Sequence, residues 1–242
     1  MSETKVALVV GAGDATGGAI ARRFAAEGYT VCVTRRKVEK LKNLVAAIEA
    51  DGGTVHAFGS DARREEQVEA LIEGIERDIG PIEVAVYNIG GNVKFPITET
   101  TTRVYFKVWE MCALGGFLMG REAAKHMLAR GRGTILFTGA TASMRGGSGF
   151  SAFASGKHAL RATAQSMARE LAPKGIHVAH VVIDGAIDTQ FIAEMFPERY
   201  ALKEQDGILN PEHIADAYLM LHNQPRSAWT FEMDMRPWIE DW

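Results

Sequence analysis

Short apolar runs rich in β-branched residues alternate with amphipathic segments along almost the whole chain. Strand-like runs occupy about 5–10, 29–34, 54–60, 81–88, 133–139 and 176–184, and helix-like segments occupy 19–28, 38–53, 65–78, 103–130, 151–172 and 210–221. The runs show little polar alternation, so we expect strands that are buried on both faces. The pattern predicts an α/β fold, with one doubly wound, Rossmann-like parallel β-sheet and helices on both faces. A last strand is expected near the C-terminus.

Length and charge limit the classes of function. The 242 residues suffice for one domain, 1–242, with a sizeable core. A net charge of −3 provides no field to attract nucleic acid or an anionic membrane, and no apolar run approaches membrane-spanning length. The two cysteines, Cys32 and Cys112, fit a reducing compartment better than a disulfide framework. We therefore expect a cytoplasmic protein with a small-molecule substrate, which binds neither nucleic acid nor membrane.

A glycine-rich loop separates the first strand-like run from the first helix-like segment. Gly11, Gly13 and Gly17 remove side chains where the chain must turn tightly and approach a ligand closely. The following helix start, with Asp14 and Thr16, would offer free N–H groups to a pyrophosphate. An ordinary strand-to-helix turn is the alternative, but a second strand follows at the distance typical of dinucleotide-binding folds.

Two arginines follow the second strand-like run, where dinucleotide folds meet the adenosine ribose. Arg35 and Arg36 suit the 2′-phosphate of NADP(H), whereas NAD(H) binding usually requires an acid there. The alternative is a solvated basic start to the next helix. Asp14 would be unfavourable beside this phosphate unless it caps a helix or pairs with one of the arginines. We predict that NADP(H) is preferred over NAD(H).

These motifs resemble those of the short-chain dehydrogenase/reductase family over nearly the whole chain. The segment VGAGDATG is similar to the family's TGxxxGxG, with Val10 for the threonine and Ala15 for the middle glycine. VYNIGG resembles NNAG, and IDGAIDT resembles PGxxxT, with Asp184 for the proline. Besides the glycine loop, the resemblance implies cofactor contacts from Asp61, Ala62, Asn88, Gly90, Lys157, Gly185, Ile187 and Thr189.

The same resemblance implies a catalytic tetrad of tyrosine, lysine, serine and asparagine, and this chain departs from it at three positions. Phe153 stands at the tyrosine, Ala140 at the serine and Cys112 at the asparagine, while Lys157 is retained. Phenylalanine has no proton to give, and alanine cannot hydrogen-bond an oxyanion. We therefore predict an atypical oxidoreductase in which the usual proton donor is absent.

Two hypotheses follow for function. In the first, the protein is an NADP(H)-dependent oxidoreductase of a small carbonyl or alcohol, with a non-standard proton donor such as Asp184 or Tyr87. The alternatives for these two residues are a turn-forming aspartate and a tyrosine packed against a helix. Nearby hydroxyls are more typical of loop hydrogen bonds: Thr138, Thr141, Ser143, Ser148 and Ser151. In the second hypothesis, the protein is a catalytically silent NADP(H)-binding sensor or partner subunit.

Three further expectations concern metals, assembly and substrate. His177 and His180 would point to opposite faces of one strand, so we predict no metal site. Small residues on the segments 103–130 and 151–172, together with the family resemblance, imply a homodimer or homotetramer. A lid at about 190–210 carries Phe191, Met195, Phe196 and Tyr200, which favours a hydrophobic substrate.

Overall fold

The computed structural model describes residues 4–241, and its centre is a seven-stranded sheet in the order β3-β2-β1-β4-β5-β6-β7. Neighbouring strands are parallel throughout. The sheet and its flanking helices form one domain. The strands are β1 (Val6–Val10), β2 (Thr30–Arg35), β3 (Thr54–Gly59), β4 (Ile82–Tyr87), β5 (Gly133–Thr138), β6 (Ile176–Ile183) and β7 (Glu232–Met235).

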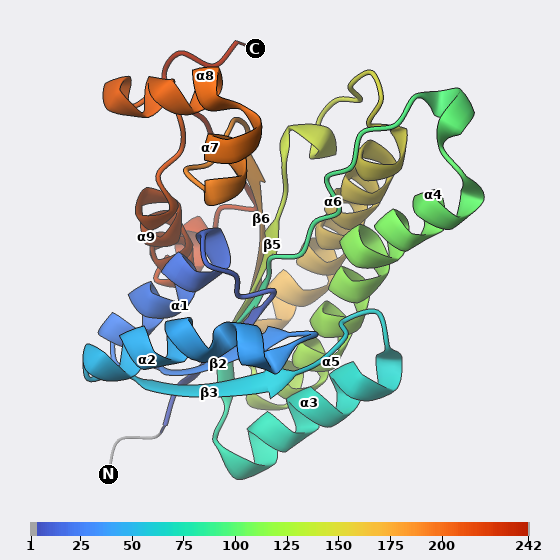
Figure 1. Ribbon diagram of the computed structural model, residues 1–242. Helices are drawn as coiled ribbons and strands as arrows, with labels where there is room; N and C mark the ends of the chain where they lie inside the picture. The colour runs from blue at the N-terminus through green and yellow to red at the C-terminus, as the bar shows by residue number, and fades with distance from the viewer. Residues whose placement is uncertain (1–3, 242) are drawn as a thin grey trace.

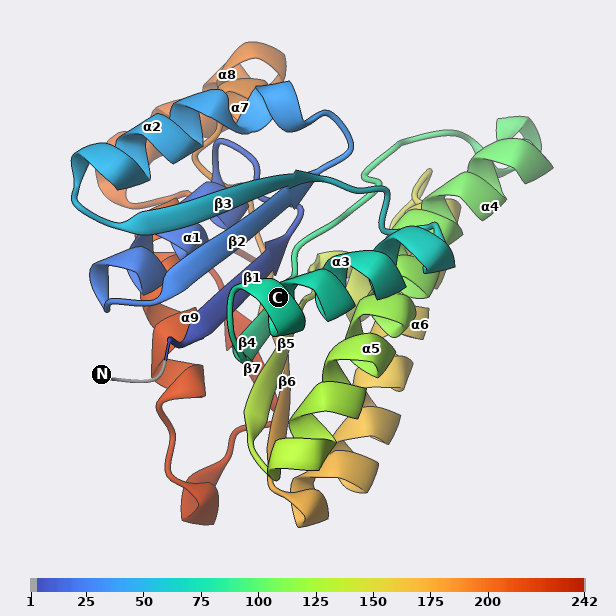
Figure 2. The ribbon, with the colours of Figure 1, turned by 90° about the horizontal axis from the view of Figure 1, so that it is seen from below.

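Helices cover both faces of the sheet, as the sequence predicts (Figures 1 and 2). One face packs against α1 (Thr16–Ala26), α2 (Lys42–Ala50) and α9 (Pro211–His222), whose core residues include Ile20, Ile48 and Ile214. The other packs against α3 (Glu65–Asp78), α5 (Gly115–Arg130) and α6 (Ser151–Leu171), with Ile72, Met119 and Leu160 in its core. No helix within residues 4–241 is long and apolar enough to cross a membrane.

Two local expectations from the sequence need correction. The strand β3 is not buried on both faces, because it lies at the edge of the sheet and its residues are exposed or half-buried. The segment 103–130 is not one regular α-helix. It consists of α4 (Thr102–Trp109), a π-helical turn η3 (Glu110–Leu114) and α5. The π-turn places Cys112 where regular i→i+4 hydrogen bonding is interrupted.

The predicted lid folds into short helices at one end of the sheet (Figure 1). These are α7 (Gln190–Met195), α8 (Pro197–Tyr200) and the 3-10 turn η6 (Ala201–Gln205). The helix α9 then begins at Pro211, and the side chain of Asn210 accepts a hydrogen bond from the Glu212 N–H at 2.9 Å. Asn210 thus caps this helix, as its type and position predict. The other 3-10 turns are η1 (Val38–Leu41), η2 (Ile97–Glu99), η4 (Thr141–Ser143), η5 (Ala172–Lys174) and η7 (Arg226–Ala228).

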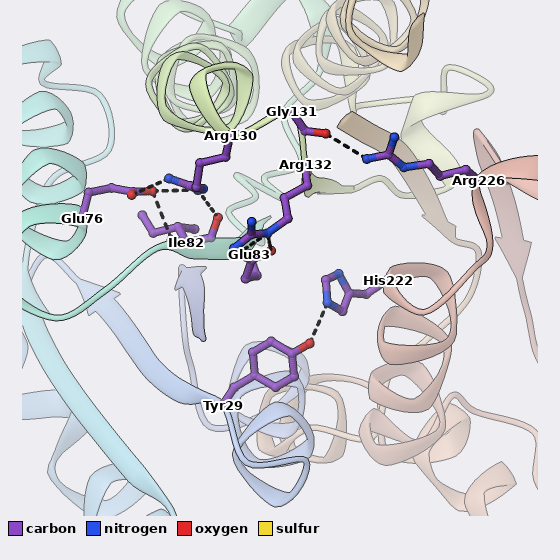
Figure 3. A network of polar contacts seen from close by, with 9 residues as sticks. All are labelled: Tyr29, Glu76, Ile82, Glu83, Arg130, Gly131, Arg132, His222 and Arg226. Carbon is purple, nitrogen blue, oxygen red and sulfur yellow. Dashed lines mark hydrogen bonds and ion pairs between the residues drawn. The ribbon is translucent and has the colours of Figure 1, made fainter. Parts of the chain in front are cut away.

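Polar contacts join the layers at the amino ends of the central strands (Figure 3). Arg130 at the end of α5 donates to both carboxylate oxygens of Glu76, at 2.6 and 3.1 Å, and to the carbonyl of Ile82 at 2.9 Å. On the opposite face, His222 pairs with the Tyr29 hydroxyl at 2.8 Å. These contacts stabilise the scaffold at the amino ends of the strands. The loops that contain Gly11 and Asn88 emerge from the opposite, carboxyl ends.

Buried histidines are expected to make the fold sensitive to acid. Burial lowers the pKa of His180 and of His222 from 6.5 to about 4 in each case. The unfolded chain therefore binds more protons between pH 6.5 and 4, so the free energy of unfolding should fall as pH is lowered through that window. Full protonation would cost roughly 3 kcal/mol per histidine.

Urea unfolding followed by tryptophan fluorescence at several pH values between 7 and 4.5 would measure this dependence. His222→Gln should flatten the slope, whereas the exposed control His213→Gln should leave it unchanged. A free energy of unfolding that stays constant from pH 7 to 5 would contradict the prediction.

Candidate cofactor and catalytic site

The strand order reverses between β1 and β4, and the loops that follow these two strands meet there. Gly11, directly after β1, has φ +90°, and a Cβ on it would lie 2.7 Å from Ile89 Cγ1 and 2.8 Å from the Asn88 carbonyl oxygen. Asn88, directly after β4, donates its backbone N–H to Val10 at 2.8 Å and its side-chain amide to the Gly11 carbonyl at 3.2 Å. In open α/β sheets such a switch point is where ligands bind.

The glycine loop leaves space at the start of α1. A Cβ on Gly17 would lie 2.5 Å from the Gly11 carbonyl oxygen, so only glycine fits that close approach. A Cβ on Gly13 would meet no atom within 4 Å, which leaves open space in front of the helix. The N-cap residue Ala15 supplies no side-chain hydrogen bond, so the first N–H groups of α1, beginning at Thr16, remain for a ligand. The arrangement fits an anionic group such as a pyrophosphate.

Arg35 and Arg36 line a cleft beside this loop. The Arg35 guanidinium is 3.9 Å from an Asp14 carboxylate oxygen and donates to the Lys40 carbonyl at 3.4 Å. Of the two arrangements that would accommodate Asp14, the structure favours pairing with arginine over helix capping. Asp14 itself is largely exposed. Arg35 therefore has only these weak partners, and Arg36 is exposed, so both arginines are available to a phosphate.

The cleft continues past the end of β3, where Asp61 meets an arginine that sequence reasoning missed. Arg63 donates to both Asp61 carboxylate oxygens, from Nε at 2.9 Å and from Nη2 at 2.5 Å. These hydrogen bonds hold the pKa of Asp61 below its usual value. The i, i+2 spacing was visible in the sequence but indicated no ion pair. The remaining lining residues are Gly11, Thr34, Ser60, Ala62, Tyr87, Ile89 and Met111.

Lys157 projects from α6 to the carboxyl ends of β4 and β5. Its side chain is buried, and Nζ donates to the carbonyls of Ile89 at 3.1 Å and Thr138 at 2.7 Å. Burial lowers its pKa from the usual value. Gly90 lies against it, since a Cβ there would be 3.9 Å from Nζ. The ammonium therefore retains one N–H for a group that binds beside Gly90.

The three residues that differ from the family pattern lie together in space. Cys112, Ala140 and Phe153 belong to one small apolar cluster, which also contains Ala142 and Phe150. The Phe153 ring centroid is 5.9 Å from Lys157 Nζ. The positions that the family resemblance pairs with tyrosine, serine and asparagine are thus occupied by apolar side chains close to Lys157.

Tyr87 belongs to a different core cluster, and its hydroxyl is already engaged. The side chain is fully buried, and its hydroxyl donates to the Met111 carbonyl, within the π-turn, at 2.5 Å. Burial raises its pKa well above the usual value. Gly115 makes this contact possible, because a Cβ on Gly115 would lie 2.2 Å from the hydroxyl oxygen. The geometry matches a packed tyrosine that anchors the π-turn rather than a proton donor.

Asp184 is also engaged, at the end of β6. It is 1% exposed, accepts a hydrogen bond from the Thr141 hydroxyl at 2.5 Å, and lies 3.4 Å from Arg145 and 3.7 Å from Arg236. All of these partners are donors or cations, so Asp184 acts here as an acceptor that links the loops after β5 and β6. Two other loop hydroxyls are occupied as well: Thr138 bonds Tyr218 at 2.7 Å, and Ser143 accepts from the Ala140 N–H at 3.1 Å. The buried Ser151 hydroxyl, in contrast, has no hydrogen-bond partner among the described residues.

The segment after β6 connects the site to the lid. Gly185 has φ +146°, Ile187 forms a β-bridge with Leu209, and the Thr189 hydroxyl oxygen accepts from the Ile192 N–H at 3.2 Å. The Thr189 hydroxyl proton therefore remains for a ligand. The C-terminal tail packs on this region, since Trp238 donates to the Gln205 carbonyl at 2.9 Å. The lid residues Phe191, Met195 and Phe196 are exposed.

Residues 4–241 contain no group of three or more His, Cys, Asp or Glu side chains arranged to hold an ion. His180 bonds Glu232 at 3.0 Å, and His177 bonds the Thr230 carbonyl at 2.9 Å. Both histidines are thus sheet residues with their own partners.

Comparison with known proteins assigns the family. Residues 5–199 match the family model described as short chain dehydrogenase. A short-chain dehydrogenase/reductase of Armillaria gallica is 32% identical over 181 residues, which are 74% of this chain and 69% of that protein. The chain therefore belongs to the short-chain dehydrogenase/reductase family of oxidoreductases.

Solved structures show the same fold over nearly the whole chain. A short-chain dehydrogenase from Rhodopseudomonas palustris is 51% identical, with a TM-score of 0.82 and coverage of 97% of this chain and 99% of the other. A metagenomic short-chain oxidoreductase in complex with NADP is 26% identical, with a TM-score of 0.82 and coverage of 98% and 99%.

Proposed function

We propose that the protein is an atypical NADP(H)-dependent oxidoreductase. The observation that carries this proposal is the cleft at the switch point, where Arg35 and Arg36 stand at the end of β2. The acid of the cleft, Asp61, is paired with Arg63. Guanidinium groups that lack a close carboxylate partner favour a 2′-phosphate, whereas the 2′-hydroxyl of NAD(H) is usually held by an acid.

The residues present fit such a cofactor from end to end. The space before Gly13 and the free N–H groups of α1 would hold the pyrophosphate. Lys157, Asn88, Gly90 and Thr189 would surround the nicotinamide and its ribose. When bound, this cofactor supplies or accepts a hydride.

We further propose that the usual proton donor is absent. Phe153 and Ala140 present only apolar surface where the family places a tyrosine and a serine. Lys157 keeps its position through two backbone carbonyls and can still orient a ribose. The substrate is then a small carbonyl compound that takes up a proton, together with the hydride, from solvent or from a group other than tyrosine, or, in the reverse direction, a small alcohol that gives up both. The exposed aromatic residues of the lid favour a hydrophobic substrate.

The decisive experiment is a calorimetric titration of the purified protein with NADPH and, separately, with NADH. Tight NADPH binding with much weaker NADH binding is expected. Binding of neither nucleotide would refute the proposal. If NADPH binds, substrate-dependent NADPH consumption by the same preparation would establish turnover.

A silent NADP(H)-binding sensor or partner subunit is the second candidate. The apolar cluster around Phe153 favours this second candidate, because apolar side chains occupy the positions of the family's tyrosine and serine and leave no proton donor there. A sensor would bind NADPH and change its affinity for a partner without consuming the nucleotide. Assembly as a homodimer or homotetramer in the cytoplasm fits either candidate and belongs to the same proposal.

A further inference from the structure

Two loops border the apolar cluster around Phe153. One, 88–98, follows β4, and the other, 139–150, follows β5, so both leave the carboxyl edge of the parallel sheet (Figure 1). The loops contact each other, because the Phe95 N–H donates to the Gly149 carbonyl at 2.8 Å. A substrate that reaches the apolar cluster therefore has both loops as neighbours.

The charge of these two loops differs from that of the whole protein. Neither loop contains an aspartate or a glutamate, whereas each contains one cationic side chain, Lys94 in the first and Arg145 in the second. The chain as a whole has a net charge of −3. The two loops therefore form a local positive region in an acidic protein, and such a region attracts anions.

Arg145 is anchored by a buried carboxylate and remains open to a ligand. Its Nη1 and Nη2 each lie 3.4 Å from an oxygen of Asp184, which is 1% exposed and also accepts from the Thr141 hydroxyl. The Arg145 side chain is 46% exposed. A guanidinium has five N–H donors, so donors remain beyond those directed at Asp184. Such a fork matches the two oxygens of a carboxylate.

Lys94 is exposed and pairs with no carboxylate among residues 4–241. Its stem lies on Gly149, where a Cβ would be 2.9 Å from Lys94 Cγ, and its Nζ is 5.9 Å from the Phe150 ring centroid. The ammonium thus lies near the start of α6. There Phe150 provides no side-chain cap, and the buried Ser151 hydroxyl has no partner within the described chain. The positive end of the helix adds to the charge of Lys94.

We propose that the substrate is a carbonyl compound, or the corresponding alcohol, that carries a carboxylate, and that Arg145 and Lys94 bind this carboxylate. Arg145 would provide paired hydrogen bonds and Lys94 a point charge. The apolar cluster and the exposed aromatic side chains of the lid would contact the apolar remainder of the molecule. This inference rests on the proposed function, because it names the class of substrate for the same site.

Calorimetry with a series of aliphatic oxo acids of increasing chain length, and with the methyl ester of each, tests the inference. The members of a pair share the ketone and differ in charge. Each probe is titrated into protein saturated with NADP⁺, which has no hydride to transfer, and into protein without nucleotide. At least one acid is expected to bind roughly tenfold more tightly than its ester, because charge-assisted hydrogen bonds favour the acid. The preference should decrease as salt is raised.

Neutral variants test the two cations separately. Arg145→Gln and Lys94→Gln should each weaken binding of the preferred acid by about fivefold and leave binding of its ester unchanged, and the double variant should lose the preference. Arg169→Gln is a matched control, because Arg169 is an exposed arginine at the opposite end of α6. It should behave as the wild type does. Circular dichroism would confirm that each variant is folded.

The inference is overturned if no acid binds more tightly than its ester, or if the double variant retains the wild-type preference. Failure of the proposed function is recognised separately. If neither NADPH nor NADH binds, the proposed function is refuted, and the comparison of acids with esters on the protein without nucleotide still decides whether the carboxylate site exists.

Discussion

Replacing both Arg35 and Arg36 with alanine is expected to weaken NADPH binding by about a hundredfold and to change NADH binding by less than threefold. Each charge-assisted hydrogen bond to a phosphate typically contributes about 1.5 kcal/mol or more, so two such bonds correspond to about two orders of magnitude in affinity. The neutral 2′-hydroxyl of NADH forms no comparable charge-assisted hydrogen bond with a guanidinium. Calorimetry at a fixed, stated ionic strength would measure both affinities, because salt screens partly exposed charges.

Two further variants sharpen this test. Arg36→Asp should reverse the preference, since a carboxylate repels the 2′-phosphate but accepts a hydrogen bond from the 2′-hydroxyl. Arg77→Ala is a matched control, because Arg77 is an exposed arginine at the end of α3 that pairs with the adjacent Asp78. If the double alanine variant still prefers NADPH, residues other than Arg35 and Arg36 select the nucleotide and the prediction is wrong.

The helices and strands of this fold were predictable where apolar residues follow a clear pattern along the sequence. The apolar runs of β1, β4 and β6 are buried throughout, β5 is buried except at Gly133, and α3 begins and ends where its amphipathic pattern does. The exposure of β3 was not predictable from its composition. It depends on the strand order, which leaves β3 with a single neighbour.

The site was predictable to the extent that it consists of chain segments at fixed distances from strands. The glycine loop, Asn88 and Lys157 meet at the switch point as the family resemblance implies. Pairings between side chains were not predictable. The clamp of Asp61 on Arg63 and the contact of Tyr87 with the π-turn depend on side-chain directions that no periodic pattern encodes. The contact of Tyr87 with the π-turn argues against Tyr87 as a proton donor, and the pairing with Asp61 identifies Arg63 as a further residue of the cleft.

Restoring the tyrosine and the serine is expected to accelerate carbonyl reduction relative to the natural chain. In Ala140→Ser/Phe153→Tyr, the serine would hold a carbonyl oxygen and the tyrosine would supply its proton, and such groups typically contribute about a hundredfold or more to rate. The new phenol would lie near Lys157, whose Nζ is 5.9 Å from the Phe153 ring centroid, and a nearby ammonium favours the ionised phenol.

Both changes add single hydroxyl groups to the apolar cluster, so the fold should tolerate them, and thermal unfolding would verify this. NADPH consumption with a panel of small ketones would measure the gain. Phe153→Tyr alone should recover only part of it, and adding Lys157→Met to the double variant should abolish it. If the natural chain already reduces these ketones as fast as the double variant does, a donor outside the Phe153 and Ala140 positions operates. The apolar cluster would then be a feature of substrate binding rather than the loss of a catalytic function.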